Sequence, residues 1–315
     1  MLVLQLVVDG LIDGGAYALI GLGLSLTFGQ LRRLNLAYGA TAMLASYLGA
    51  AIYATQRVPV WLVAVTVIAA ATLIGWYVEW ICFARSGQEP DHGGAPTFGA
   101  PIAGADGREV VALASSFAIW MQLEQLAVNL LPRHLNAFPS LAAQQDWLIN
   151  SAFGELMVRA DRLLLALLAA ALILGLGAWL ERSRTGLSWR ACADHRVAAH
   201  LVGMPVARLQ TAGFAMACAL SGFAAFAVLS LDGQVTPMFG MWVLLKGLVA
   251  AMLGGLGSVR GVLWGGLLLG VIEAFAQALL GAQGREFATY ALLFLILVAP
   301  WNPRESLVFS AGLRG

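Results

Sequence analysis

Long apolar runs alternate with short polar breaks along nearly the whole chain. Nine apolar runs stand out, over 6–29, 34–53, 59–83, 110–131, 163–180, 209–230, 243–254, 261–280 and 286–300. Most are about as long as a membrane-spanning helix, and they are continuous rather than alternating like the strands of a membrane barrel. The pattern therefore predicts an all-α integral membrane protein with about 8–10 transmembrane helices.

The run 243–254 is too short to cross a hydrocarbon core of about 30 Å at about 1.5 Å per residue. It leads into the glycine-rich sequence LGGLGSVRG. Non-helical backbone at membrane depth is tolerated where protein buries it or where it lines a cavity. We therefore predict a short or broken helix that ends inside the protein.

Small residues recur at four-residue spacing after this run, a pattern that lets helix backbones approach closely in lipid. The glycines concerned are Gly257, Gly261 and Gly265, followed by Gly266 and Gly270. They predict tight helix packing, either within one subunit or between two subunits.

A polar segment at 181–208 interrupts the apolar pattern and contains the five arginines Arg182, Arg184, Arg190, Arg196 and Arg208. Charges this dense do not lie in hydrocarbon, and the arginine excess predicts a cytoplasmic loop. With this loop inside, the cytoplasmic side receives twelve arginines and the outside five. The count predicts a multi-pass chain with its N-terminus outside and its C-terminus in the cytoplasm.

Two other polar segments separate the spans within what we predict to be a single polytopic domain over 1–315. The Gly/Pro-rich stretch 84–109 is expected to be a flexible cytoplasmic loop. The stretch 132–162 carries Phe138, Trp147 and Phe153 among polar residues and is expected to lie outside, at the membrane interface.

Composition agrees with a membrane protein and excludes several function classes. The chain is 60% hydrophobic and 11% charged, against about 25% charged residues in soluble domains. Its net charge of +1 makes nucleic acid an unexpected partner. There is no GxxxxGK[ST], HExxH or GxSxG sequence and no CxxC pair, so we expect no catalytic residues, no metal site and no ATP hydrolysis by this chain alone.

One polar stripe runs along the span 110–131. It consists of Ser115, Ala118, Gln122, Gln125 and Asn129, at spacings that place them on one helical face. Polar groups in a span are costly unless they face a cavity or one another. The stripe therefore predicts either part of a translocation pathway or hydrogen bonds between helices.

Four further residues each allow two interpretations of their role. Asn35 and Tyr38, at the start of the second span, either contact solute or, for Asn35 in particular, cap the helix. Lys246 and Glu273 are intramembrane charges. A buried pair would have a structural role, whereas separate charges would favour a pathway.

Several stretches resemble a known family. They are RACADHRVAAHLVGMPVAR at 190–208, GAYALIGLGLSLTFGQLRRLNLAYGA at 15–40, LLKGLVAAMLGGLGSVRGVLWGGLLLGVIEAFA at 244–276 and LLFLILVAPWNP at 292–303. Together they resemble the shorter of the two permease subunits of bacterial branched-chain amino acid ABC transporters, in the hydrophobic amino acid uptake family.

The resemblance implies an inner-membrane importer subunit that works with a homologous second permease, two cytoplasmic ATPases and an extracytoplasmic solute-binding protein. ATP would be used by the partner subunits, and this chain would bind no cofactor. The segment from Gly186 to Gly203 would form the coupling helix that docks on one ATPase. The positions that match the family motif best are Gly186, Arg190, Asp194, Ala198 and Gly203.

The chain departs from the family at some positions. It has Leu36-Ala37-Tyr38-Gly39 where the family usually has Phe-Ala-His-Gly, and Ser115-Ser116-Phe117 in place of a Thr-Ile-Gly pattern. The solute therefore stays open: branched-chain or related amino acids, or else urea, short amides or aromatic acids. A function of another class, a stand-alone secondary transporter or channel, is the remaining alternative.

Overall fold

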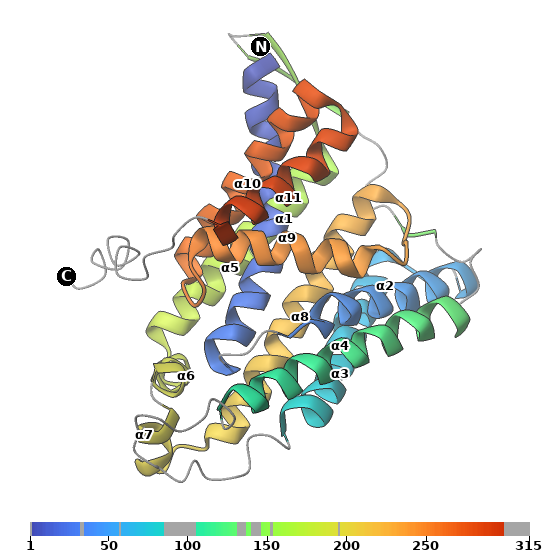
Figure 1. Ribbon diagram of the computed structural model, residues 1–315. Helices are drawn as coiled ribbons and strands as arrows, with labels where there is room; N and C mark the ends of the chain where they lie inside the picture. The colour runs from blue at the N-terminus through green and yellow to red at the C-terminus, as the bar shows by residue number, and fades with distance from the viewer. Residues whose placement is uncertain are drawn as a thin grey trace, which may run out of the picture.

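The computed structural model describes residues 2–31, 35–56, 58–84, 105–130, 137–139, 146–151, 154–194 and 196–298. The chain is a bundle of helices with one small hairpin (Figure 1). The longer helices are α1 (Leu2–Leu31), α2 (Ala37–Gln56), α3 (Val60–Val78), α4 (Ala105–Leu130), α5 (Ala160–Arg182), α8 (Val206–Asp232), α9 (Phe239–Gly254), α10 (Val259–Leu280) and α11 (Ala282–Val298). The shorter elements are the π-helix η1 (Glu79–Ala84), α6 (Arg184–Asp194), α7 (Arg196–Leu201), and the strands β1 (Asp146–Ser151) and β2 (Gly154–Arg159).

Each of the nine predicted apolar runs forms a helix, which confirms the predicted all-α membrane fold. In the part of the chain that the structure describes, α1, α3 with part of η1, α5, α8 and α10 are long and apolar enough to cross a membrane. The short run is longer than predicted, because α9 begins at Phe239 rather than 243, but its 16 residues still leave it short. A length of about 24 Å follows from the helical rise.

Helix α1 is the hub of the bundle and packs against α5, α8, α9 and α10, most extensively against α10. Glycines make this contact possible. A Cβ atom on Gly14 would lie 2.8 Å from the carbonyl oxygen of Gly266, and one on Gly270 would lie 2.5 Å from the amide nitrogen of Gly14. The four-residue glycine spacing on α10 therefore serves packing within this chain.

The connection from α9 to α10 is a sharp reversal, and residues 256–258 within it are exposed. Gly255 and Gly257 adopt φ angles of +86° and +92°, which side-chain-bearing residues rarely tolerate. The amide of Gly257 donates to the buried Ser25 hydroxyl of α1 at 2.8 Å. The hydroxyl of Ser258 then accepts from the amide of Gly261 at 3.1 Å and caps α10. The predicted break after the short helix is confirmed, but the described part of the chain does not enclose it as predicted.

Lys246 and Glu273, each 1% exposed, form a buried ion pair between α9 and α10. The same carboxylate accepts from the Tyr17 hydroxyl at 2.8 Å and from Arg285 Nε at 3.1 Å. The Thr289 hydroxyl also bonds both members of the pair. Because Lys246 and Glu273 form a buried pair, we assign them the structural role rather than a place in a pathway.

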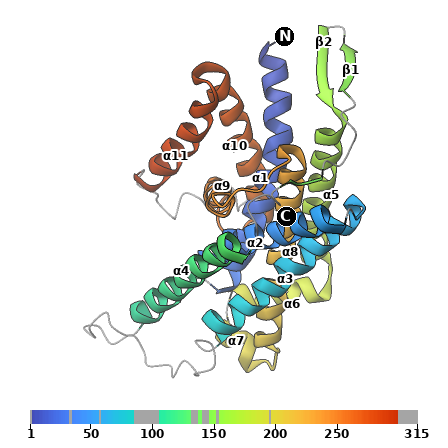
Figure 2. The ribbon, with the colours of Figure 1, turned by 90° about the vertical axis from the view of Figure 1, so that its right-hand side faces the viewer.

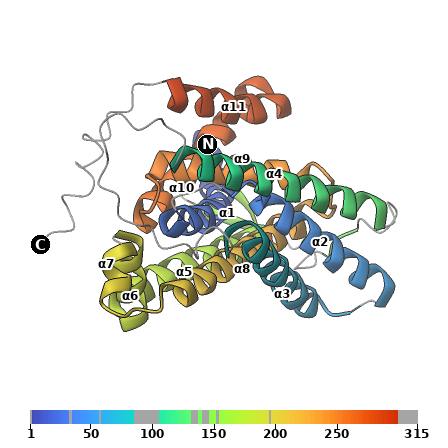
Figure 3. The same cartoon turned by 60° about the horizontal axis from the view of Figure 1, so that its bottom comes forward.

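This network attaches α11 to the rest of the bundle. Figure 3 shows α11 at the rim of the molecule, and it packs chiefly against α9 and α10. Arg285 of α11 reaches α1, where its Nη2 lies 3.1 Å from Asp13 Oδ2, and Lys246 lies 3.5 Å from Glu286. A charged cluster thus joins α1, α9, α10 and α11.

The two ends of the bundle carry different features. Figure 2 shows the start of α1 and the β1–β2 hairpin at one end and the helices α6 and α7 at the opposite end. The N-terminus and the hairpin therefore lie on the side away from the predicted coupling loop.

The hairpin was not predicted. Strands β1 and β2 pair antiparallel from Asp146↔Arg159 to Ser151↔Gly154, within the segment expected to lie at the interface. The expectation was also wrong for Phe138, which is buried and packs against Phe226 with ring centroids 5.7 Å apart. A backbone bridge between Ala137 and Gln234 fixes this stretch to the end of α8. The side chains of Trp147 and Phe153 lie outside the described part.

The predicted loop at 84–109 ends earlier than expected. Helix α4 begins at Ala105, so the last residues of the 84–109 segment belong to a helix. Residues 85–104 lie outside the described ranges, and the predicted flexibility of this loop stays a prediction.

The buried network leads to a stability prediction. Substitution Glu273→Gln leaves Lys246 and Arg285 without their shared carboxylate, and we expect the free energy of unfolding to fall by about 3 kcal/mol. Glu286→Gln removes a partly exposed carboxylate and should cost less than about 1 kcal/mol. Denaturant titration in detergent micelles measures both values. Equal stability of the two variants would contradict a stabilising role for the buried pair.

A second prediction concerns the α1–α10 contact. Gly270→Ala places a methyl group against the backbone of α1, and we expect a loss of about 1–3 kcal/mol of unfolding free energy. Gly175 of α5 is the matched control, because nothing lies within 4 Å of its Cβ position. Gly175→Ala should be neutral or stabilise by up to about 1 kcal/mol. Similar unfolding free energies for both variants would show that α1 and α10 are not held at backbone contact.

Candidate functional site

The segment between α5 and α8 is a compact helical turn. The hydroxyl of Ser183 accepts from the amide of Gly186 at 2.9 Å and caps the start of α6. A Cβ atom on Gly186 would lie 2.5 Å from the Leu180 carbonyl oxygen, so the chain needs glycine to fold α6 back against the end of α5.

Arg190 lies on α6 and holds it to the preceding helix. Its Nη2 donates to the Glu181 carbonyl oxygen at 3.2 Å. The Glu181 carboxylate in turn forms an ion pair with Arg260 of α10 at 2.9 Å. The segment is therefore linked to the start of α10 as well as to α5.

The structure has two helices where one coupling helix from Gly186 to Gly203 was expected. Helix α6 ends at Asp194 and α7 begins at Arg196. The side chain of Asp194 lies outside the described part.

Gly203 ends α7 as the sequence predicted. Its φ angle is +81°, its amide donates to the His200 carbonyl oxygen, and the Met204 amide donates to the Ala199 carbonyl oxygen. This pair of bonds is a Schellman motif, which favours glycine at the left-handed position. Behind it, a small apolar cluster packs the segment onto the start of α8: Cys192, Ala199, Met204, Val206 and Leu209.

The end of α7 presents an apolar tip. Leu201 and Val202 are 83% and 78% exposed, and the adjacent Ala198 is also exposed. The two side chains form a small exposed apolar patch at the tip of a polar segment. The sequence analysis missed this pair, although two apolar residues directly before the helix-ending glycine were a visible signal.

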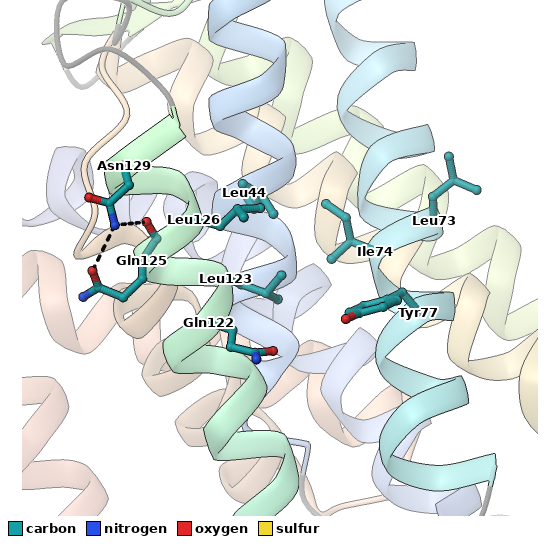
Figure 4. Close-up of a pocket in the computed structure, with 9 residues that line it drawn as sticks. All are labelled: Leu44, Leu73, Ile74, Tyr77, Gln122, Leu123, Gln125, Leu126 and Asn129. Carbon is teal, nitrogen blue, oxygen red and sulfur yellow. Dashed lines mark hydrogen bonds between the residues drawn. The ribbon is translucent and has the colours of Figure 1, made fainter.

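A groove of about 760 Å³ lies between α3 and α4 (Figure 4). Helix α3 provides Leu73, Ile74 and Tyr77, helix α2 provides Leu44, and helix α4 provides Gln122, Leu123, Gln125, Leu126 and Asn129. Three members of the predicted polar stripe thus line one groove. The α3 residues were not predicted, because their run is apolar on every face and gives no periodic signal.

The amides of this groove are only partly satisfied. Asn129 Nδ2 donates to the backbone oxygen of Gln125 at 2.9 Å and to its Oε1 at 3.3 Å. No described residue hydrogen-bonds the Gln122 side chain. The groove therefore offers amide donors and acceptors to whatever occupies it.

The remaining stripe residues lie elsewhere on α4. Ser115 is half-buried, and its hydroxyl bonds the Cys82 thiol of η1. The neighbouring Ser116 is buried, and its hydroxyl accepts from the Leu36 amide at 3.4 Å. Ala118 is exposed. Ser115 therefore belongs to a helix contact in this conformation.

Asn35 and Tyr38 are not among the residues that line the groove. Asn35 Oδ1 accepts from the Ala37 amide at 3.1 Å, which is the capping role. Its Nδ2 is buried and bonds no described group. The Tyr38 hydroxyl donates to the Ile20 carbonyl oxygen at 3.0 Å in the core. Both side chains are enclosed in this conformation.

The described residues contain no cluster of three or more His, Cys, Asp or Glu side chains that could hold a metal ion. The α6–α7 turn at one end of the bundle and the groove beside α4 are the two candidate functional regions.

Comparison with known proteins identifies the family of this chain. Residues 6–299 match the family described as the permease component of branched-chain amino acid transport systems. The chain is 27% identical over 303 residues to the high-affinity branched-chain amino acid transport system permease protein BraD of Pseudomonas aeruginosa, covering 94% of this chain and 93% of that one. It is 26% identical over 304 residues to the LivH permease protein of Escherichia coli, covering 94% and 92%.

A shorter similarity links the chain to a sugar system. The fructose import permease protein FrcC of Rhizobium meliloti is 27% identical over 125 residues, which is 38% of this chain and 34% of that one. The match to the amino acid permeases extends over nearly the whole chain, and this protein belongs to the permease-component family of branched-chain amino acid transport systems.

Proposed function

We propose that this chain is a transmembrane permease subunit of a binding-protein-dependent ABC importer that moves branched-chain or related amino acids into the cytoplasm. The family membership supports permease function. The observation that carries the importer assignment is the α6–α7 turn, a well-packed segment that projects an apolar tip at one end of a membrane bundle. A channel or secondary transporter has no need of such a docking element.

The partners in this proposal are two cytoplasmic ATPases, a second permease and an extracytoplasmic solute-binding protein. One ATPase receives Leu201 and Val202 in an apolar groove, with Ala198 close to its surface. Arg190 holds α6 to α5, so that force applied to the turn reaches the membrane helices. ATP binds to the partner subunits, and its hydrolysis there drives alternating access of this chain.

The same proposal gives the orientation in a bacterial inner membrane. With α6 and α7 in the cytoplasm, the start of α1 and the β1–β2 hairpin face outward, since they lie at the opposite end (Figure 2). This agrees with the arginine count of the sequence. The C-terminus, expected in the cytoplasm, lies outside the described ranges.

For the solute route we propose the groove beside α4, with Gln122, Gln125 and Asn129 as its polar contacts. Weak amide contacts suit a pathway, because tight binding there would slow release. Asn35, Tyr38 and Ser115 are enclosed in this conformation and would reach solute only in another one. Against a stand-alone secondary transporter, Lys246 and Glu273 are not separate charges along a pathway but paired members of a cluster that joins four helices.

The ATPase contact gives the third prediction. The double substitution Leu201→Ser/Val202→Ser removes most of the apolar tip, which should cost about 3 kcal/mol of docking free energy and therefore about a hundredfold in ATPase affinity. Leu279→Ser is the matched control, because Leu279 is 81% exposed near the turn between α10 and α11. Co-purification of tagged ATPase with each variant measures retention. Full retention with the double variant would exclude α7 as the docking element.

The solute is tested by ATPase activity of the complete complex in nanodiscs with its binding protein. We expect leucine, isoleucine or valine to stimulate hydrolysis at least several-fold over the unloaded binding protein. Urea, acetamide, an aromatic acid and fructose complete the panel. Stimulation by one of these alone would keep the importer class and replace the amino acid assignment. A chain that transports solute with no ATPase bound would refute the importer class itself.

A further inference from the structure

Helix α4 has two faces of different chemistry. Ile119, Leu123 and Ala127 are buried on the face toward the bundle, and α4 packs chiefly against α2. The opposite side is exposed along the helix, and its middle consists of Ala114, Ala118, Met121, Gln122, Gln125 and Asn129, with the exposed Leu113, Phe117 and Leu126 at its edges. We call this set the α4 outer face.

The α4 outer face lies at membrane depth. The groove beside it is bounded on the other side by Leu73, Ile74 and Tyr77 (Figure 4). These residues are in the interior of the apolar span Val60–Cys82. The groove and the amides that line it are therefore at the level of the hydrocarbon, where no water is available to satisfy them.

Lipid tails do not satisfy this face. Gln122 bonds no described residue, and Gln125 and Asn129 bond only α4 itself within the described chain. The outer faces of α5 and α11 differ from it, since large apolar side chains such as Leu167 and Phe294 occupy their middle, whereas α4 carries its exposed large apolar side chains mainly at the edges of the amide-bearing face. Those helices suit a lipid boundary, whereas α4 requires a neighbour with hydrogen-bonding groups.

The composition of the α4 outer face fits a second helix. Ala114 and Ala118 are four residues apart, a spacing that lets another helix approach closely. The three amides follow along the same face toward the end of α4. Small residues combined with amide side chains are the two features that join helices in membranes.

We propose that the α4 outer face, together with the α3–α4 groove, is the surface that the second permease subunit covers. A spanning helix of that subunit packs on Ala114 and Ala118 and faces Gln122, Gln125 and Asn129 across the open side of the groove. The proposed solute route is then incomplete in this chain alone, because the second permease closes the open side of the groove. This inference depends on the proposed importer function for the existence of a second permease.

Site-specific photo-crosslinking tests the surface. A benzophenone amino acid replaces Met121 on the α4 outer face, and control variants carry it at Leu167 of α5 or Phe294 of α11, which are also exposed. Each variant is co-expressed with the complete transporter, purified through a tag on the ATPase and irradiated. Peptide masses of the crosslinked band identify the captured chain.

We expect Met121 to capture the second permease at least tenfold more than either control position. A variant at Leu126, also exposed on α4, repeats the test if the Met121 variant does not assemble. Capture of the second permease from Leu167 or Phe294 but not from α4 would overturn the proposed surface.

The same preparations separate this inference from the proposed function. A complex that hydrolyses ATP in response to loaded binding protein, yet shows no α4 crosslink to the second permease, refutes the surface and leaves the importer intact. A chain that co-purifies with neither an ATPase nor a second permease refutes both.

Discussion

The backbone contact between α1 and α10 is the constraint on which the bundle depends. Gly10 and Gly14 of α1 meet Gly266 and Gly270 of α10, where a Cβ atom on Gly14 would lie 2.8 Å from the Gly266 carbonyl oxygen. Such close approach gains dispersion contacts that lipid does not replace, because helix association in membranes lacks a hydrophobic driving force. Helices α5, α8 and α9 pack around the pair that α1 forms with α10.

The charged network completes this frame at one side. Lys246 and Arg285 share the Glu273 carboxylate, and Arg285 also pairs with Asp13, where α1, α9, α10 and α11 meet. A buried charge in a membrane is tolerated only when it is paired, so the network fixes the positions of four helices relative to one another. Its cost in desolvation is offset by the hydrogen bonds from Tyr17 and Thr289. The intramembrane charges thus have a structural role, because they hold the four helices together.

The sequence predicted most of the fold and part of the candidate site. Apolar runs are a strong signal, so the nine longer helices of the described chain, with the short α9 among them, could be predicted. The hairpin could not, because its residues show no clear alternation. Gln122, Gln125 and Asn129 were predicted to share a face, since polar residues stand out in an apolar helix. Tyr77 was missed, because in a uniformly apolar helix nothing marks the side that faces a groove.

Helix α8 connects the two functional regions of the proposed importer. It begins at Val206, within the apolar cluster that supports α7, and then packs closely along α3. A Cβ atom on Gly75 of α3 would lie 2.6 Å from Cys218 Cβ, and one on Gly222 of α8 would lie 2.7 Å from Ala71 Cβ. Such close packing makes α3 and α8 move together. A displacement of α7 by an ATPase would therefore reach the α3 wall of the groove through α8, and would reach α4 only through α2, which packs against both α3 and α4.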